Sequence, residues 1–494
     1  MRKQILLLIC IFSVGFSYAD FDMNNNMREA YSNIISLNFQ LAQEMIDQEK
    51  ISNPENGLIY LNENYIDFLT LLISEDKLLY SSRKSNKNRR LNNLRKNNKE
   101  TPYYLFSQAE IHLQWAFTRI KFKEYFLAAY ELQKAYKLLK KNNQLYPDFM
   151  LNKKSMGLLH VLIGSVPDSY DWVLNIVGIE GNINVGFDEL YSFLDYSERI
   201  DKYRIYENET LFLLSFLEMN MNNDIKACEM LLDKIKSCCL KDNLLVFCAA
   251  RLSNKLGNND ETISILERRK FSDSKFQFHY LDYLYAMSKF YKLEFNSAKE
   301  YLLKFTSNFK GKNYIKSAYH KLSLIAFLED SLAQREYYHA RILNYGEKLI
   351  DEDRQAENDI QNDIVINRDL LIARILFDGG YYNETLNKLN KLSVNEISLN
   401  NDLSIEYYYR LARTNQKLLN NQVIDLFLKV LSYDNYSNLY YHPMSTLQIG
   451  LEFEKEGNKD EAIRFFKKTL SYNDFNYENG IKKSAKAGIN RLLN

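Results

Sequence analysis

The side chains that most often carry chemistry are few in this sequence, and they do not form a catalytic or metal-binding pattern. No two histidines have the His-Glu-x-x-His spacing that places two zinc ligands and a general base on one helix face. We therefore expect each histidine to lie on a helix surface or in the core. The histidines are His112, His160, His279, His320, His339 and His442.

Glycines and serines do not supply a catalytic loop either. Gly178, Gly181 and Gly186 lack the Lys-Ser/Thr that grips a nucleotide phosphate. No Gly-x-Ser-x-Gly turn is present to expose a nucleophilic serine. The sequence therefore predicts a protein that is not an enzyme, with no catalytic residue, no metal and no cofactor.

Four cysteines, Cys228, Cys238, Cys239 and Cys248, lie close together in the chain. Their separations of ten, one and nine residues match no zinc pattern. Cys228 follows the small residue Ala227, where a buried thiol packs well. Cys239 and Cys248 can face each other across a turn, and export permits a disulfide. Of three interpretations we favour buried free thiols, then one disulfide, and last a metal site.

Residues 83–99 hold eight basic side chains, many Asn and no acid. Because blocks of like charge repel, we expect a solvated, partly disordered loop. The functional alternative is contact with an anionic surface, such as lipid head groups, an acidic envelope polymer or an acidic partner. Nucleic acid is not expected, because the run has no aromatic residue on which bases would stack. The candidate contact residues are Arg89, Arg90, Arg95 and Lys96.

A second charged stretch is acidic. It begins with Asp351-Glu352-Asp353 and continues through Glu357, Asp359 and Asp363. We expect a solvated loop between helices. Calcium binding is disfavoured, because the glycine that shapes a calcium-binding loop is missing.

The composition indicates that helices position these residues. Only five Pro and sixteen Gly occur in 494 residues, whereas all-β and loop-rich proteins need both residue types for turns. Hydrophobic residues make up 46% of the chain, which is ample for a folded core. Long helices joined by short connections fit this composition. Residues 27–82 are predicted as two helices, one around residues 34–45 and one around residues 61–72.

The first residues have the three parts of a secretory signal peptide. Arg2 and Lys3 precede an apolar run over residues 5–16, and Ser17-Tyr18-Ala19 places small residues before a cut at Asp20. The run is short for a membrane span. We expect residues 1–19 to be removed and the protein to reach a periplasm or the cell exterior. Without Arg2 and Lys3, 62 basic residues stand against 63 acidic ones, so net charge gives no argument for nucleic acid.

A repeated pattern organises most of the chain. Near the C-terminus, Gly450 is followed by Phe453, by Gly457-Asn458 and, twelve residues after Gly450, by Ala462. Two antiparallel helices approach closely only where their facing side chains are small. The same separation of twelve recurs at Ala116/Ala128, Ser215/Ala227, Ala250/Thr262, Ala286/Ala298 and Ala373/Thr385. Ala412/Ile424 is a poorer example, because Ile424 is not small. One more pair is placed on Ala326 and Ala340, with a turn two residues longer.

This pattern resembles the tetratricopeptide repeat superfamily, in degenerate form, over about residues 101–140 and 205–494. The resemblance implies an all-α fold, a tetratricopeptide-like α-solenoid in which antiparallel helix pairs form a right-handed superhelix. The predicted organisation is a signal peptide (1–19), N-terminal helices with the basic loop 83–99 (20–100), a first helix pair with a Gly/Pro-containing insert (101–204), and a repeat array (205–494).

The insert, residues 150–194, concentrates glycine and proline. It is similar in part to a tetratricopeptide subfamily tied to mitochondrial outer membranes and inclusion clearance. The similarity lies in the helix ending Ser165-Val166-Pro167 and in the turn Gly178-Ile179-Glu180-Gly181-Asn182. We take it as a structural indication only.

The resemblance also indicates where a partner would bind. In such solenoids the first helix of each pair lines the concave wall. We expect a protein or peptide partner there, held by Tyr283, Arg374, Tyr409 and Arg413, since Tyr and Arg are enriched in binding hot spots. The alternative is that these rings pack against the neighbouring repeat. A second class of function, binding of a glycan or envelope polymer, would call for exposed Trp, and the chain has two Trp. The sequence does not fix an oligomeric state.

Overall fold

The structure is a computed structural model, all-helical throughout the part of the chain that it describes. It confirms the prediction of an all-α helical-repeat solenoid built from paired helices. The predicted signal peptide, residues 1–19, lies outside the described residues. The described residues are 21–166, 172, 176, 178, 181–222, 224–238, 242–269, 275–361, 366–392, 397, 400–434 and 439–493.

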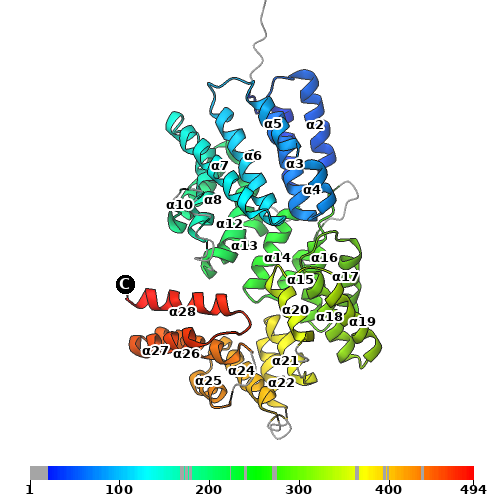
Figure 1. Cartoon of the computed structure of the whole chain (residues 1–494), viewed down its shortest axis with the longest axis vertical. Helices are drawn as coiled ribbons and strands as arrows, with labels where there is room; N and C mark the ends of the chain where they lie inside the picture. The colour runs from blue at the N-terminus through cyan, green and yellow to red at the C-terminus, as the bar shows by residue number, and fades with distance from the viewer. Residues whose placement is uncertain are drawn as a thin grey trace, which may run out of the picture. The chain divides into compact units, whose positions relative to one another are not determined.

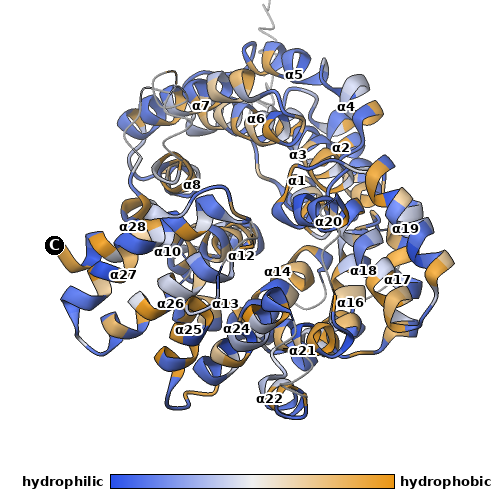
Figure 2. Cartoon of the chain, turned by 60° about the horizontal axis from the view of Figure 1, so that its bottom comes forward, coloured by the Kyte–Doolittle hydropathy of each residue, from blue (hydrophilic) through white to orange (hydrophobic). Residues whose placement is uncertain are grey.

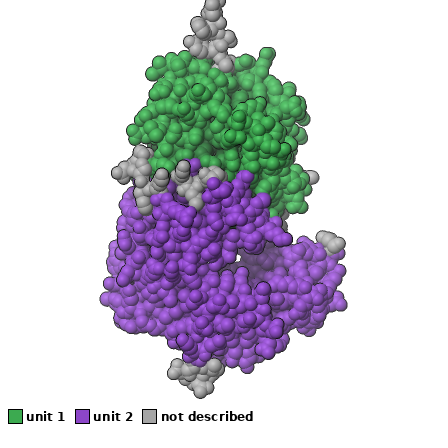
Figure 3. All heavy atoms as spheres, turned by 180° about the vertical axis from the view of Figure 1, so that it is seen from behind, with its two compact units in different colours: residues 1–222, 271–276 green, residues 223–270, 277–494 purple. Residues whose placement is uncertain are grey.

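The chain separates into two compact units, coloured in Figure 3. Unit 1 comprises residues 1–222 and 271–276, and unit 2 comprises residues 223–270 and 277–494. In the described part of the chain, no helix combines the length and the apolar character that crossing a lipid bilayer requires.

Unit 1 is built around three packed pairs, α1 with α2, α6 with α7 and α8 with α10, and α3 lies against both α1 and α6. The helices α6 and α7 run side by side in Figure 1. The elements of unit 1 are α1 (Asn25–Ile35), α2 (Phe39–Ser52), α3 (Leu58–Ser74), α4 (Lys77–Arg83), α5 (Asn86–Leu94), α6 (Pro102–Lys121), α7 (Tyr125–Leu145), α8 (Leu151–Gly164), α10 (Ile183–Arg199), α11 (Asp201–Arg204), α12 (Glu207–Leu217) and the π-helical turn η2 (Glu218–Asn222).

Unit 2 contains six consecutive pairs, α14/α15, α16/α17, α18/α19, α21/α22, α24/α25 and α26/α27. Most of its helices carry hydrophobic residues on one side and hydrophilic residues on the other (Figure 2). Its elements are α13 (Ile225–Cys238), α14 (Asn243–Lys255), α15 (Asn259–Glu267), α16 (Tyr280–Tyr291), α17 (Phe295–Asn308), α18 (Ile315–Leu328), α19 (Leu332–Asn344), α20 (Asp351–Gln361), α21 (Arg368–Asp378), α22 (Tyr382–Asn390), α24 (Asn401–Lys417), α25 (Val423–Leu431), α26 (Tyr441–Lys455), α27 (Lys459–Ser471) and α28 (Glu478–Leu493).

Among the described residues, eight turns between paired helices share one geometry. In the α6/α7 turn the N–H of Lys123 donates to the carbonyl of Ile120 (3.1 Å), and the N–H of Glu124 donates to that of Arg119 (2.8 Å). These are the two bonds of a Schellman motif, in which one residue adopts a left-handed conformation. The other turns contain the same two bonds. The left-handed residues, with φ between 55° and 82°, are Leu37, Lys123, Gly257, Leu293, Asp330, Gly380, Leu419 and Gly457.

The predicted small residues stand in a fixed register to this turn. In six pairs the first lies seven residues before the left-handed residue and the second five residues after it. The α26/α27 pair shows why they are small. A Cβ added to Gly450 would lie 3.3 Å from the carbonyl oxygen of Ala462 and 2.7 Å from the ring of Phe466. A larger side chain would push the two helices apart.

Two predictions about the pairs are wrong. The α18/α19 turn has its left-handed residue at Asp330, so the same register falls on Ser323 and Arg335, and Ala340 is exposed. No longer turn is present in this pair. In addition, the single helix predicted around residues 34–45 is interrupted at Leu37, which gives α1 and α2.

The α1/α2 pair is a further repeat that the sequence analysis missed. Its small residues are Ala30 and Ala42, again seven before and five after the left-handed residue, and both are fully buried. Leu37 itself stands where a turn would be expected to show glycine. The turn was therefore hidden within an apolar run.

The basic segment is folded, which corrects the prediction of a loop over residues 83–99. Most of it forms α5. The guanidinium of Arg90 is only 4% exposed and bonds to Asp67 Oδ2 (2.6 Å) and Glu63 Oε2 (3.3 Å). Lys87 is also buried and pairs with Glu131. Arg90 therefore cannot contact an external anionic surface, whereas Arg89, Arg95 and Lys96 are exposed.

The described part of the insert contains a helix pair that crosses on glycine. A Cβ on Gly157 of α8 would lie 2.7 Å from the carbonyl oxygen of Gly186 in α10, and a Cβ on Gly186 would lie 2.6 Å from that of Gly157. The glycines therefore permit the same close approach that alanine permits in other pairs. Of the turn 178–182 that carries the subfamily similarity, Ile179 and Glu180 lie outside the described residues.

Candidate functional site

The acidic stretch forms a helix, which corrects the prediction of a solvated loop. Asp353 of α20 is fully buried. It accepts the N–H of Tyr314 at Oδ2 (2.7 Å) and of Ser317 at Oδ1 (2.8 Å), which satisfies the free N–H groups where α18 begins. Burial raises the pKa of Asp353 to about 7, against the lowering effect of these two bonds. Sequence could not show that a carboxylate from another helix caps α18.

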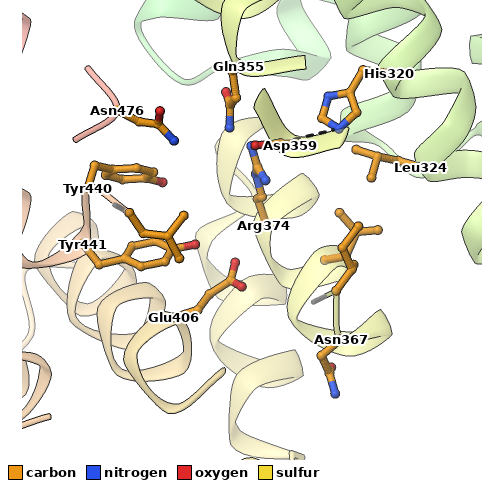
Figure 4. A pocket seen from close by; sticks show the side chains of 13 residues that line it. His320, Leu324, Gln355, Asp359, Asn367, Arg374, Glu406, Tyr440, Tyr441 and Asn476 are labelled. Carbon is orange, nitrogen blue, oxygen red and sulfur yellow. Dashed lines mark ion pairs between the residues drawn. The ribbon is translucent and has the colours of Figure 1, made fainter. Parts of the chain in front are cut away.

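With α20 fixed in this way, a pocket forms among α18, α20, α21, α24 and the start of α26. It contains about 600 Å³ of empty space, a value that includes open solvent at its mouth. Leu324, Leu371, Tyr440 and Tyr441 supply its apolar walls (Figure 4). Its polar lining residues are His320, Gln355, Asp359, Asn367, Arg374, Glu406 and Asn476.

His320 and Asp359 form one side of the pocket. The Nε2 atom of His320 lies 3.5 Å from Oδ2 of Asp359. Burial lowers the pKa of His320 well below its usual value, with nearby Lys321 and Arg374 acting in the same direction. Burial also raises the pKa of Asp359, although Arg374 and Lys321 oppose this. The imidazole is therefore neutral at pH 7, and the contact is not a pair of full charges.

Arg374 is the cation of the pocket. Its side chain is 23% exposed, and its nearest ion-pair partner, Oδ2 of Asp378, is 3.9 Å from Nε. No hydrogen bond joins its guanidinium to any described residue. Arginine remains protonated in proteins and presents five N–H donors in a planar fork that suits a carboxylate. Arg374 therefore has donors available for an incoming acceptor.

Glu406 lies on the opposite side and is already engaged. Its Oε1 atom accepts from Nε (3.1 Å) and Nη2 (3.0 Å) of Arg410, which is 4% exposed. The negative charge of Glu406 is thus compensated by a buried arginine. An anion that enters the pocket would meet Arg374 rather than an unpaired carboxylate at this wall.

Residues near the C-terminus close over α20. Asn358 of α20 donates from Nδ2 to Oδ1 of Asn476 (3.4 Å), and the hydroxyl of Tyr477 donates to Gln355. The ring of Tyr440 lies 5.4 Å from that of Tyr477, edge to face. Residues more than a hundred positions apart therefore meet at the rim of the pocket.

The structure separates the four residues predicted to line a groove. Tyr283 and Tyr409 are each 5% exposed. The Tyr283 hydroxyl lies 2.9 Å from Oγ of Ser317, and the Tyr409 ring packs on Tyr441 at 5.0 Å. The alternative interpretation, packing between repeats, therefore holds for both rings. Of the four predicted residues, Arg374 is the one that lines the pocket.

Arg413, the fourth predicted residue, is not part of the pocket lining. Its guanidinium carbon lies 6.0 Å from the centre of the Phe377 ring, and its buried Nε atom has no hydrogen-bond partner among the described residues. It is partly buried against neighbouring helices of unit 2. Arg374 and Arg413 each follow a small residue by one position, so their place in the repeat did not show which of the two arginines lines the pocket.

The prediction of buried thiols is supported for the two cysteines of this cluster whose side chains the structure describes. Cys228 and Cys248 are buried, with 0% and 1% exposed surface. Cys239 and the side chain of Cys238 lie outside the described residues. Within the described ranges, no group of three or more His, Cys, Asp or Glu side chains is arranged to hold a metal ion.

His320, Asp359 and Asn476 are pocket residues that the sequence analysis did not select. His320 is a single histidine in an apolar helix, Asp359 is one of several acids in a charged stretch, and Asn476 lies in a turn. The available signal was the spacing of Asp353, Glu357 and Asp359 in a helix-forming run that follows a repeat. The contact of Asp359 in α20 with His320 in α18, and that of Asn476 with α20, are tertiary properties.

Comparison of the sequence with known proteins found no matching family model. It also found no curated protein with significant similarity. The site is therefore interpreted from its own geometry.

Proposed function

We propose that this chain is an exported interaction scaffold made of degenerate tetratricopeptide-type helix pairs, and that it binds a protein or peptide partner without catalysing a reaction. The eight Schellman turns in one register and the small residues around them support the repeat assignment. The signal-peptide pattern of residues 1–19 supports export.

The observation that carries the binding proposal is the state of Arg374. Its guanidinium lies in a pocket with tyrosine walls and amide side chains, and it makes no hydrogen bond to the described residues. A carboxylate from an acidic side chain of a partner would accept two of its N–H groups. The amides of Asn367 and Asn476 provide further donors.

The comparison of two arginine variants tests this proposal. We expect Arg374→Gln to weaken partner capture by at least about tenfold, because a desolvated charge pair is lost. Arg413→Gln is the matched control, because it removes an equal charge from the same unit outside the pocket. Partners can be captured by a photo-crosslinker at Asn473, an exposed residue close to Asn476 in the chain, in intact cells and quantified by mass spectrometry. Equal capture by both variants would refute the assignment of the pocket.

Export is tested separately by sequencing the N-terminus of the protein isolated from cells. We expect it to begin at Asp20. A mature protein that retains Met1 would contradict export through residues 1–19. This result would not affect the assignment of the pocket, because the pocket lies in unit 2.

A further inference from the structure

The outer face of α7 in unit 1 exposes large apolar side chains at its N-terminal end. Phe126 is 66% exposed, Tyr130 47% and Leu127 45%. Burial of such side chains away from water is favourable, so a group of them on one surface marks a site of contact. These side chains remain exposed to solvent beside the described part of the unit.

Trp172 extends the same group. Its ring lies 6.2 Å from that of Phe126, with planes only 14° apart, and it is 37% exposed. Together with Leu127 these rings border a shallow depression that is open to solvent. The surface offers protruding rings rather than a deep groove that would enclose a partner's side chain.

A row of lysines continues from the aromatic residues along the same face. Phe126, Tyr130, Lys134, Lys137 and Lys141 are spaced by four, four, three and four residues, which places them on one stripe of a helix. The Nζ atom of Lys134 lies 4.5 Å from the centre of the Tyr130 ring. Lys137 and Lys141 are exposed.

The two acidic residues of α7 and of its N-cap position, Glu131 and Glu124, do not neutralise the stripe. Glu131 is buried on the other side of α7, where Nδ1 of His112 lies 2.5 Å from its Oε2 atom and Lys87 pairs with its Oε1 atom. Glu124 pairs with Arg119. The exposed face of α7 therefore combines apolar rings at one end with positive charge at the other.

We propose that this stripe, from Phe126 to Lys141 with Trp172 beside it, binds the surface of an anionic lipid bilayer. Aromatic rings with polar edges are favoured at the depth of lipid head groups, and lysine side chains extend from that depth toward anionic phosphates. Protruding apolar side chains and a cationic row on one helix face are the features of an interfacial surface. The charge complementarity identifies anionic lipid, rather than neutral lipid, as the occupant.

Flotation with vesicles tests the proposal on the full chain without residues 1–19. We expect binding to phosphatidylcholine vesicles in which about a third of the lipid is phosphatidylglycerol, and much weaker binding to phosphatidylcholine alone. Replacement of each exposed lysine should weaken binding about fivefold, so Lys137→Ala/Lys141→Ala should weaken it about 25-fold. Phe126→Ser/Leu127→Ser should weaken it about tenfold or more.

A control comes from an exposed apolar face elsewhere in the chain. Leu332 and Tyr337 of α19 are 66% and 52% exposed. The arginines of that helix, Arg335 and Arg341, lie over the Phe327 and Tyr337 rings instead of forming an exposed row. Leu332→Ser/Tyr337→Ser should leave vesicle binding unchanged. Equal binding by the α7 variants and the parent chain would overturn the proposal, as would equal binding to neutral and anionic vesicles. Retention of an acidic protein or polymer with no vesicle binding would overturn it as well.

Trp172 provides a second readout at the surface itself. The other tryptophan, Trp115, is 2% exposed and should emit in the same way with or without lipid. We expect anionic vesicles to shift the emission of the parent chain to shorter wavelength, and Trp172→Phe to abolish the shift while helix content is retained. Vesicle binding without any shift would place the contact elsewhere and refute the proposal.

Discussion

The carbonyl oxygen of Gly257 occupies the place where Gly380 would carry a side chain, because a Cβ on Gly380 would lie 1.9 Å from that oxygen. Both glycines are the left-handed residues of their turns, in α14/α15 and α21/α22. The neighbouring Tyr381 hydroxyl accepts from Asn259 (3.1 Å) and donates to Asp260 (2.9 Å). Two turns from distant repeats of unit 2 therefore pack directly on each other.

We expect Gly380→Ala to lower the free energy of unfolding by about 3 kcal/mol or more. The alanine would be strained at its positive φ and would also displace the Gly257 backbone. Gly457→Ala is the matched control, since Gly457 has a similar φ of 78° but no atom within 4 Å of an added Cβ. It should cost only about 1 kcal/mol. Thermal unfolding followed by circular dichroism compares them, and equal losses would contradict the close packing.

Leu419→Gly is expected to stabilise unit 2. Leu419 is 88% exposed and adopts a φ of 56°, so it bears the strain of a left-handed residue without burying its side chain. Glycine removes the strain, and we expect a gain of about 0.5–1 kcal/mol. Leu419→Ala removes the side chain but retains the strain and should show no such gain. Urea denaturation of both variants measures the difference.

Glu131 should make unit 1 sensitive to acid. Burial alone would raise the pKa of Glu131, but hydrogen bonds from His112 and Lys87 lower it from 4.5 to about 2. Because the pKa of Glu131 is lower in the folded chain than in the unfolded chain, its carboxylate stabilises the folded state. This stabilisation is fully present above the unfolded-state pKa of about 4.5 and is lost as pH falls to about 2. We expect this contribution to be about 3 kcal/mol.

Glu131→Gln tests this expectation, because it should remove the pH dependence in that window. Both tryptophans of the chain, Trp115 and Trp172, belong to unit 1, so tryptophan fluorescence during urea denaturation reports on this unit. The parent chain and the variant should converge below about pH 2, where Glu131 is protonated. Parallel stability curves from pH 4.5 to pH 2 would show that the carboxylate is not responsible.

Lys154 should be essential to the stability of unit 1. It is 1% exposed, pairs with Glu209 and lies 3.8 Å from Oε2 of Glu110. The single hydroxyl proton of Tyr65 lies within hydrogen-bond reach of both carboxylates, with the oxygen 2.8 Å from Glu110 Oε2 and 2.9 Å from Glu209 Oε1. Lys154→Met leaves two buried carboxylates without a cation, which we expect to cost about 3–5 kcal/mol.

The double variant Lys154→Met/Glu209→Gln identifies the cause of that loss. Removal of one carboxylate should restore part of the stability, because less uncompensated charge remains buried. Fluorescence-detected urea denaturation again measures both proteins. A double variant that is less stable than the single variant would indicate lost packing rather than unpaired charge.

The turns show how far local sequence information reached in this chain. Gly257, Gly380 and Gly457 mark three turns by residue type, but Leu37, Lys123 and Leu419 adopt the same conformation without any local signal. The small residues that flank the turns were visible because tight helix packing requires them. Ala340 was misplaced because it is small yet exposed, and burial cannot be read from residue size.

The candidate site was much less predictable than the fold. Tyr283 and Tyr409 were selected by residue type and repeat position, and both proved to be buried in the core. Arg374 was selected by the same argument and does line the pocket. The difference arises because α20, an additional helix, and the turn at Asn476 approach only one part of the repeat surface.

The sequence by itself determined the all-helical character, the pairing of neighbouring helices and the register of most pairs. These properties depend on contacts between residues about twelve positions apart, so a local pattern records them. Only the tertiary structure decided that Asp353 caps α18, that Arg90 is buried beside Asp67, and that the Gly257 and Gly380 turns touch. Those contacts join residues far apart in the chain, and their energies depend on burial and on partners that no local pattern specifies.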